Sequence, residues 1–403
     1  MADAIERPTF KKPEYPSDPR PLWDKIHWVH VILLSTTPLI AIYGFMTTPV
    51  FFKTFVFTII YYFLSGLGIT AGYHRLWSHV SYKATYPLQV FLAIASGAAV
   101  QGSIFWWSRD HRVHHRYTDT PRDPYDARQG FFHCHMGWML VRKDRRQLGY
   151  ADTSDLKTDP VVRWQHKYYP LIAVIMSAVV PTLICGLGWG DYRGGYFYAG
   201  ITRMVVLHHA TFCVNSLAHT IGRSTYDDSQ TAKDSVVTAV VTLGEGYHNF
   251  HHEFPGDYRN AIRFYQYDPT KWFIKLFFYL GLAYDLKTFP SNEIEKGYIE
   301  MQLKKLLQQQ AKIDYGVPVE KLPVYTEAEF LTQVRKFNKK WMVIENVIYD
   351  VNSFINDHPG GKPLIQSGIG KDMSEAFTGG VYKHHRAAHN LLSQLRVGTI
   401  KQF

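Results

Sequence analysis

"FFKTFVFTIIYYFLSGLGIT", residues 51–70, is an apolar run of about the twenty residues that an α-helix needs to cross the core of a bilayer. A similar run, residues 28–46, precedes it, and a second pair follows at residues 168–188 and 196–216. Only a short polar turn separates the members of each pair, which favours membrane hairpins over the buried core helices of a large soluble protein. The sequence therefore predicts a mainly α, polytopic protein with four transmembrane helices.

A further apolar run, residues 87–107, allows three interpretations: a span, a re-entrant segment or an interfacial helix. If it does not cross, four spans place the N-terminus, residues 71–167 and the C-terminal half of the chain on one side of the membrane. All the histidine-rich motifs then share that side. If it does cross, the first of these motifs faces the opposite side from the second, and no shared site forms.

The distribution of charge predicts the orientation. The formal net charge is +10, and basic stretches such as "VRKDRRQ" (141–147) lie outside the loops within each span pair. By the positive-inside rule, the histidine-rich side faces the cytosol. Membrane orientation and acidic lipid headgroups explain the basic balance, so no nucleic-acid partner is expected. Three cysteines lack metal-ligand or disulfide-like spacing and are expected to be reduced thiols: Cys134, Cys185 and Cys213.

Two histidine motifs share one spacing. "DHRVHHRYTD" (110–119) contains His-x-x-His-His, and "YHNFHH" (247–252) repeats it, although the pattern has a random probability of only about 1 in 8,000 per position. On an α-helix, positions i, i+3 and i+4 share one face, so each motif can direct three imidazoles at one spot. Neutral imidazole binds iron, zinc, copper and nickel, so the motifs predict a metal without identifying it. The candidate ligands are His111, His114, His115, His248, His251 and His252.

Two further stretches add candidates. "GYHRLWSHVSY" holds His74 and His79, which on a regular helix diverge by about 140°. They cannot both chelate one ion without a local break in the helix, but they could serve two neighbouring ions. "CVNSLAHTIG" sets Asn215 and His219 four residues apart, on one helix face. His208 lies on the same helix face as Asn215, and core packing or tunnel lining is expected for it rather than ligation.

The composition changes after Pro290, and the last part of the chain resembles a separate soluble α+β unit. It begins with a predicted capping box at Thr326 and Glu329, and "KWMVIENVIYDVNSF" predicts two strands joined by a tight turn at Glu345–Asn346. The predicted parts are a flexible tail (1–22), a membrane domain (23–290), a helical connector (291–321) and a small soluble domain (322–403).

The haem prediction depends on two motifs. "DHPGGKPLI" holds His358 in a Pro-Gly-Gly turn, and "VYKHHRAAHNLL" supplies three histidines that compete as the second ligand: His384, His385 and His389. Two imidazoles can fill both axial positions of a haem iron, which would then pass electrons rather than bind oxygen. The alternative is a surface turn and a histidine-rich helix without any cofactor.

The residues "HRLWSH", "DHRVHH" and "GEGYHNFHHEFPGDYRN", in this order among paired spans, resemble the three histidine boxes of membrane acyl-CoA Δ9 desaturases. "HPGG" resembles cytochrome b5, and a C-terminal fusion of this kind is similar to the fungal type of stearoyl-CoA desaturase. The likeness covers residues 20–290 and 322–403. It implies a four-helix membrane domain with a cytosolic, histidine-rich helical cap. It also implies a di-iron centre with nine ligands: His74, His79, His111, His114, His115, His219, His248, His251 and His252.

The resemblance implies further roles. Asn215 matches a position associated with a metal-bound water, and His358 and His384 match the axial ligands of haem b, although His385 stands where serine is usual. The acyl-CoA headgroup would meet Arg109, Asp110, Arg142 and Lys143, of which the last two could instead be topology charges only. Trp107 is similar to a tunnel-wall residue, and Tyr62 to the residue that closes the far end of the tunnel.

The implied reaction is insertion of a cis double bond between C9 and C10 of C16 or C18 acyl-CoA. An alkyl C–H bond is unreactive, so O2 must be activated at a redox metal, with electrons relayed through the fused haem domain. NADH would supply them through a separate cytochrome b5 reductase, because the chain has no Gly-rich dinucleotide fingerprint. The resemblance implies the endoplasmic reticulum membrane, with both termini cytosolic. The alternatives are a desaturase or hydroxylase of another lipid class and a membrane electron-transfer haemoprotein whose histidines bind structural metal.

Overall fold

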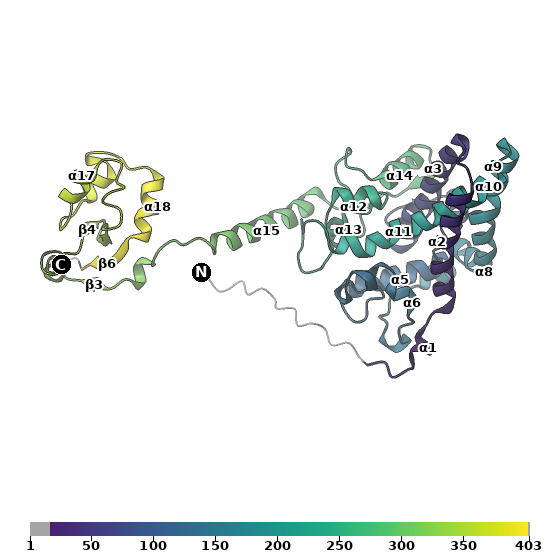
Figure 1. Cartoon of the computed structure of the whole chain (residues 1–403), viewed down its shortest axis with the longest axis horizontal. Helices are drawn as coiled ribbons and strands as arrows, with labels where there is room; N and C mark the ends of the chain where they lie inside the picture. The colour runs from purple at the N-terminus through teal and green to yellow at the C-terminus, as the bar shows by residue number, and fades with distance from the viewer. Residues whose placement is uncertain (1–16, 402–403) are drawn as a thin grey trace. The chain divides into compact units, whose positions relative to one another are not determined.

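The computed structural model describes residues 17–401 of the chain. It contains two compact units, one extending to Gln302 and the other comprising Leu303–Phe403. Unit 1 is helical, and unit 2 combines short helices with a four-stranded sheet (Figure 1). The division falls inside α15 (Ser291–Gln310), so the first half of the predicted connector belongs to unit 1. Ile294 of that half packs with Phe250 and Phe254.

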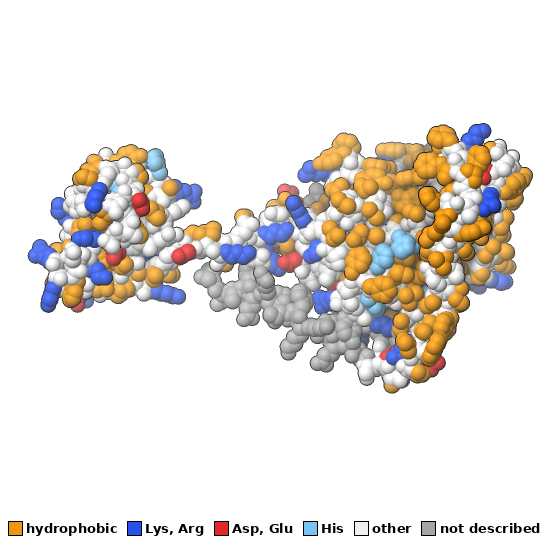
Figure 2. Space-filling model, in the orientation of Figure 1, with side chains coloured by type: hydrophobic (Ala, Val, Ile, Leu, Met, Phe, Trp, Pro, Cys, Tyr) orange, Lys and Arg blue, Asp and Glu red, His pale blue; other side chains and the backbone are white. Residues whose placement is uncertain are grey.

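Among the residues that the structure describes, three helices of unit 1 are long and apolar enough to cross a membrane. They are α2 (Trp28–Thr47), α3 (Phe52–Leu67) with its continuation η1 (Gly68–Ser78), and the continuous run of α8 (Pro160–Val174), η5 (Ile175–Val179) and α9 (Val180–Trp189). Their outward side chains are exposed and apolar (Figure 2). Such a continuous apolar surface suits contact with lipid, so three of the predicted spans correspond to membrane-compatible helices.

The fourth predicted span is helical but more polar. Residues 196–216 belong to η6 (Gly195–Thr202) and α11 (Arg203–Ser216), which follow the short helix α10 (Tyr192–Gly194). η6 packs against α2, α3 and α9. Arg203 is almost fully buried, as expected for a polar side chain that faces the interior of a helix bundle. That residues 196–216 cross the membrane stays a prediction.

The ambiguous run at 87–107 is not one helix. It is divided between α4 (Tyr86–Gly97) and α5 (Ile104–Tyr117) by the turn formed by residues 98–103. The twelve residues of α4 extend about 18 Å at 1.5 Å per residue, which is less than the roughly 30 Å of a bilayer core. This excludes a continuous span, so the segments that contain His74 and His111 can lie on the same side of the membrane.

Short helices complete unit 1. β1 (Lys83–Ala84) pairs with β2 (Ala283–Tyr284) and ties the segment after η1 to the segment after α14. The largest buried core joins η1, α4, α5 and α14. The remaining elements are α1 (Leu22–Lys25), η2 (Ala127–Gln129), η3 (His133–Gly137), α6 (Trp138–Leu140), η4 (Arg145–Gln147), α7 (Ser154–Thr158), η7 (Leu217–His219), α12 (Val236–Val241), α13 (His248–Glu253) and α14 (Pro269–Tyr279).

Unit 2 is built on a sheet with strand order β3-β6-β5-β4, in which β3 lies parallel to β6 and the other pairs are antiparallel. The predicted hairpin is confirmed, because Glu345 and Asn346 have φ values of 52° and 64°, as a type I′ turn requires. The capping box at Thr326 is confirmed as well. The elements are η8 (Val319–Lys321), β3 (Val324–Tyr325), α16 (Glu327–Arg335), β4 (Trp341–Ile344), β5 (Val347–Asp350), α17 (Lys362–Ser367), η9 (Ala376–Gly380), α18 (Arg386–Gln394) and β6 (Arg396–Ile400).

Candidate functional site

The nine predicted histidines of unit 1 lie together in two neighbouring clusters, within each of which the candidate ligand atoms are at most 4.8 Å apart. The rings of His115 and His252, one from each cluster, stack at 4.4 Å. We call them cluster 1 and cluster 2. Cluster 1 consists of His74, His79, His111, His115 and His251, and cluster 2 of His114, His219, His248 and His252.

Each His-x-x-His-His motif contributes to both clusters. Positions i and i+4 of the first motif, His111 and His115, join cluster 1, whereas the i+3 residue His114 joins cluster 2. The second motif does the reverse, because His251 joins cluster 1. The expectation that each motif directs three imidazoles at one spot is therefore wrong. The i+3 and i+4 side chains point about 100° apart around the helix, which is enough to serve two adjacent centres.

His74 and His79 join the same cluster, so of the two alternatives that the sequence left open, the structure shows the one with a local break in the helix. The reason is the local helix geometry: η1 is a π-helix, and the His79 backbone N–H donates to the His74 carbonyl, five residues back, at 3.1 Å. In a π-helix, positions i and i+5 lie one turn apart on one face. This is the local break that a shared metal requires.

The spacing of the imidazole nitrogens fits metal ligation. Two ligands at right angles around an ion, with bonds of about 2.1 Å, lie roughly 3.0 Å apart. In cluster 1, the Nε2 atom of His251 is 2.9 Å from that of His74 and 3.0 Å from that of His115. In cluster 2, the Nε2 atom of His248 is 3.1 Å from that of His219 and 3.0 Å from that of His252. The Nε2 atoms therefore converge as ligands around two centres would.

Hydrogen bonds behind the rings fix which nitrogen faces each cluster. His74 Nδ1 lies 3.0 Å from Glu245 Oε2, and His114 Nδ1 lies 2.9 Å from Asp123 Oδ1. His219 Nδ1 is 2.8 Å from Thr231 Oγ1. A carboxylate on Nδ1 holds the tautomer whose Nε2 lone pair points at the metal and makes that nitrogen a better donor. Sequence reasoning missed Glu245 and Asp123, although Glu245 lies only three residues before His248.

The protonation states also suit a metal centre. Burial, with a contribution from His114, lowers the pKa of His219 to about 3. Burial and neighbouring imidazoles lower the pKa values of His111, His251 and His252 well below the usual value in the same way. Burial would raise the pKa of Glu245, but the charge of Arg75 and the hydrogen bond to His74 lower it to about 2. Neutral imidazoles beside an ionised carboxylate are the forms that bind a metal cation.

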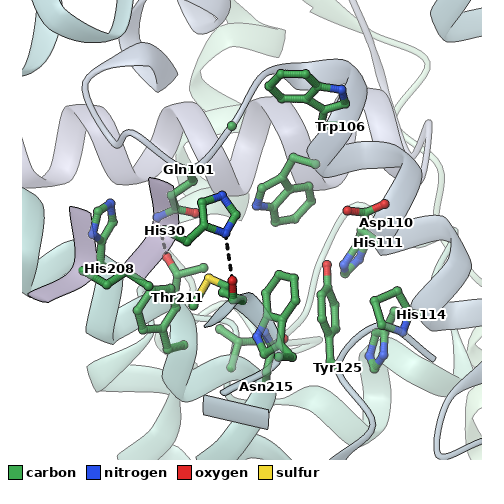
Figure 3. Close-up of a pocket in the computed structure, with 18 of the residues that line it drawn as sticks. His30, Gln101, Trp106, Asp110, His111, His114, Tyr125, His208, Thr211 and Asn215 are labelled. Carbon is green, nitrogen blue, oxygen red and sulfur yellow. Dashed lines mark hydrogen bonds between the residues drawn. The ribbon is translucent and has the colours of Figure 1, made fainter. Parts of the chain in front are cut away.

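A cavity of about 1210 Å³ runs along both clusters. Its lining includes basic residues (Arg20, Arg109, Arg142, Lys143, Arg146), cluster residues (His74, His111, His114, His248) and apolar residues (Leu33, Leu34, Gly66, Ile69, Leu207, Leu243). Figure 3 shows Asp110, His111, His114 and Tyr125 on one side of it and Gln101, His208 and Thr211 on another. The cavity exceeds the roughly 300–1,000 Å³ of most small-molecule sites and suits a long ligand with an anionic head.

Most of the predicted substrate residues line this cavity. Trp107 stacks on His111 at 4.9 Å, and Arg109 donates to Asp110 at 2.7 Å. Asn215 also lines the cavity but belongs to neither cluster. Tyr62 is not among the lining residues and packs instead against the main core, so its role at the tunnel end stays a prediction. Gly66, one turn further along α3, does line the cavity.

Arg142 and Lys143 differ in their surroundings. The Arg142 side chain is exposed, whereas the Lys143 ammonium donates to the backbone carbonyl of Asp123 at 2.9 Å. Burial lowers the pKa of Lys143. Because Asp123 orients His114, Lys143 supports the metal clusters as well as lining the cavity.

In unit 2, two predicted haem ligands have matching environments. His358 Nδ1 lies 3.3 Å from the Gly361 carbonyl, and His384 Nδ1 lies 3.0 Å from the Phe377 carbonyl. A backbone acceptor on Nδ1 leaves Nε2 with its lone pair free for a metal. His385 is exposed, and its Nε2 is engaged by the Tyr382 hydroxyl at 2.9 Å, which favours His384 as the second ligand.

Comparison with known proteins agrees with this arrangement. Residues 49–287, more than half of the chain, match the family described as Fatty acid desaturase. The chain belongs to the fatty acid desaturase family. Residues 326–401 of this desaturase match the Cytochrome b5-like Heme/Steroid binding domain, so unit 2 is a cytochrome b5 domain of a haem-binding type.

Several curated relatives of this desaturase are acyl-CoA desaturases by name. The "Probable acyl-CoA desaturase" of Schizosaccharomyces pombe is 53% identical over 94% of this chain and 78% of its own length. "Acyl-CoA desaturase 1" of Saccharomyces cerevisiae is 48% identical over 94% of this chain and 74% of its own length. "Stearoyl-CoA desaturase 5" of Bos taurus is 44% identical over 67% of this chain and 82% of its own length.

Proposed function

We propose that this membrane desaturase is an oxidoreductase that inserts a cis double bond between C9 and C10 of C16 and C18 acyl-CoA, as a stearoyl-CoA 9-desaturase does. Two iron ions in clusters 1 and 2 would supply the oxygen activation that cleavage of an alkyl C–H bond requires. The single observation that carries the proposal is the cavity, which joins a basic region, both histidine clusters and an apolar region.

Different side chains have different roles in the proposed reaction. The basic side chains bind the phosphates of the headgroup, and the exposed Arg142 is one of them. Trp107 confines the acyl chain beside His111, and the apolar lining excludes water from its distal part. Glu245 and Asp123 keep the Nε2 atoms of His74 and His114 aimed at the metals. Asn215, which lines the cavity, would hold a metal-bound water.

The cytochrome b5 domain would supply two electrons one at a time through haem b bound by His358 and His384. Covalent attachment raises its effective concentration toward about the millimolar range, which spares a diffusional search for a separate carrier. A cytochrome b5 reductase would reduce the haem with NADH. We place the protein in the endoplasmic reticulum membrane with both termini and the clusters on the cytosolic side, because the basic region of the cavity lies on the cluster side.

Expression in a host that lacks its own desaturase tests this function. Gas chromatography with mass spectrometry of derivatised fatty acids is expected to show new C9 double bonds in C16 and C18 acids. An unchanged profile, with the protein in membranes and its haem formed, would contradict the proposal and favour another lipid substrate or an electron-transfer role.

Replacing Arg142 by alanine is expected to raise KM for acyl-CoA by about tenfold and to leave kcat unchanged, because an exposed guanidinium contributes only to binding of the headgroup. Lys143→Ala is expected to raise KM and also to lower kcat, since it frees the Asp123 loop behind His114. Steady-state kinetics in membranes measure both values, with exposed Lys157→Ala as the charge-matched control. Equal KM values for the wild type and Arg142→Ala would remove Arg142 from the headgroup site.

Replacing Glu245 by glutamine is expected to lower iron content or kcat by about 10- to 100-fold, the usual cost of losing a carboxylate behind a metal-bound imidazole. The amide keeps the size of the side chain but not the charge that faces His74 and Arg75. Iron per chain and turnover are the measurements, and exposed Glu293→Gln is the control. A fully active, fully iron-loaded Glu245→Gln protein would show that this carboxylate does not tune the ligand.

A further inference from the structure

The turn between α4 and α5 is held by an unusual number of buried side chains. We call residues 98–104 the pinned turn. Arg203 Nη2 donates to the Ala98 carbonyl at 2.9 Å, and His208 Nε2 lies 2.8 Å from the Ala99 carbonyl and 3.1 Å from the Val100 carbonyl. Both side chains come from α11, and both are almost fully buried.

Other helices hold the remainder of the pinned turn. The Tyr169 hydroxyl of α8 accepts from the Gly102 backbone N–H at 2.8 Å, and the Tyr73 hydroxyl of η1 donates to the Gly102 carbonyl at 3.0 Å. Gln165 Oε1 accepts from the Ile104 backbone N–H at 3.0 Å. Three helices distant in sequence therefore fix one short connection.

The pinned turn is also strained. Val100 has φ +52°, a left-handed conformation that a β-branched side chain rarely adopts. Such a conformation persists only where the surroundings over-determine it, and it commonly marks a functional site. The His208 side chain forms a hydrogen bond with the Val100 carbonyl. Both partners of His208 Nε2 are carbonyl oxygens, which can only accept, so Nε2 carries the hydrogen and donates to them.

The pinned turn forms part of the wall of the substrate cavity. Val100, Gln101 and Gly102 line it together with His208. Figure 3 shows Gln101 and His208 on the same side of the cavity. The turn leads directly into α5, which carries Trp107 and His111. The position of the wall relative to the clusters is therefore set through the pinned turn.

We propose that His208 is a positioning residue for the desaturation reaction: by holding the Ala99 and Val100 carbonyls, it fixes the cavity wall and thereby selects which acyl carbons face the histidine clusters. The inference rests on the proposed acyl-CoA desaturase function. His208 belongs to neither cluster 1 nor cluster 2, and the hydrogen bonds of its Nε2 go to the pinned turn.

The test is the position of the new double bond in fatty acids from a host lacking its own desaturase and expressing the full chain. His208→Leu keeps an apolar side chain of similar bulk but removes the donor, and we expect the fraction of double bonds away from C9 to rise by about fivefold or more. His208→Gln restores a donor near the Nε2 position, and we expect a product pattern close to that of the wild type. His209→Leu is the matched control, because the exposed neighbour His209 bonds His135 instead of the turn.

A merely structural role predicts a different result. His208→Leu would then lower the total product without changing its double-bond position, and that outcome would overturn the proposal. If His208→Leu does not accumulate, His208→Asn decides, because its amide keeps the position polar but is too short to reach both the Ala99 and Val100 carbonyls. An unchanged double-bond position in His208→Asn would also overturn the proposal. Absence of C9 products from the wild type would instead contradict the proposed function.

Discussion

Replacing His251 by alanine is expected to lower desaturation by more than about 100-fold, because this histidine is central to cluster 1. Its Nε2 atom lies 2.9 Å from that of His74 and 3.0 Å from that of His115, and its side chain is 1% exposed. Alanine removes this imidazole, leaves a void at its position and supplies no ligand atom of its own. Loss of even an outer partner of a metal ligand typically costs 10- to 100-fold, so loss of the ligand itself should cost more. Desaturated product and iron per chain are the measurements.

The same variant separates the two cofactors. His251 belongs to unit 1, so the absorbance spectrum of the haem bound in unit 2 is expected to stay unchanged. His209→Ala is the matched control, because His209 is an exposed histidine outside both clusters. Full activity of His251→Ala would remove cluster 1 from the mechanism, and simultaneous loss of the haem would indicate general misfolding instead.

The sequence predicted the membrane helices well where the helices are uniformly apolar. Hydropathy located α2, α3 and α8–α9 because length and composition alone decide whether a helix suits a bilayer. The segment containing α11 was less clear, since its polar side chains face the protein interior. The run at 87–107 could not be resolved from hydropathy, because its break depends on hydrogen bonds from α8 and α11 to the pinned turn.

The candidate site shows a similar division. The i, i+3 and i+4 spacing selected the six histidines of the two His-x-x-His-His motifs, and the stretches around His74, His79 and His219 added the other three that the structure brings together. It could not divide them between two clusters, because that division depends on how α5, α13 and η1 face one another. The π-helical geometry that unites His74 and His79 has no sequence signal in a single chain. Glu245 and Asp123 were equally hidden, since no motif spacing links them to His74 and His114. His208 was expected to pack in the core or line the tunnel, and it does line the cavity, but its bonds to the Ala99 and Val100 carbonyls had no signal in the sequence.

Replacing His358 by alanine is expected to produce the opposite phenotype to His251→Ala: the haem is lost while iron in unit 1 is retained. His358 is held in its turn by a hydrogen bond between Nδ1 and the Gly361 carbonyl, and alanine supplies no axial ligand. Without the haem, electrons no longer reach the clusters from the fused domain, so desaturation is expected to fall by more than about tenfold, the advantage of a tethered donor. The haem absorbance and iron content of purified full-length protein, together with product formation, are the measurements.

Addition of a separate cytochrome b5 distinguishes electron delivery from catalysis in this variant. If His358→Ala loses only its internal donor, excess soluble cytochrome b5 with reductase and NADH is expected to restore part of the activity, because clusters 1 and 2 in unit 1 are intact. His385→Ala is the matched control, since this exposed histidine is engaged by Tyr382 and is expected to keep the haem. Haem loss in His385→Ala would assign the second axial position to His385 instead of His384. A normal haem spectrum in His358→Ala would remove His358 from the haem site, and with it the route by which the fused domain is proposed to reduce the clusters.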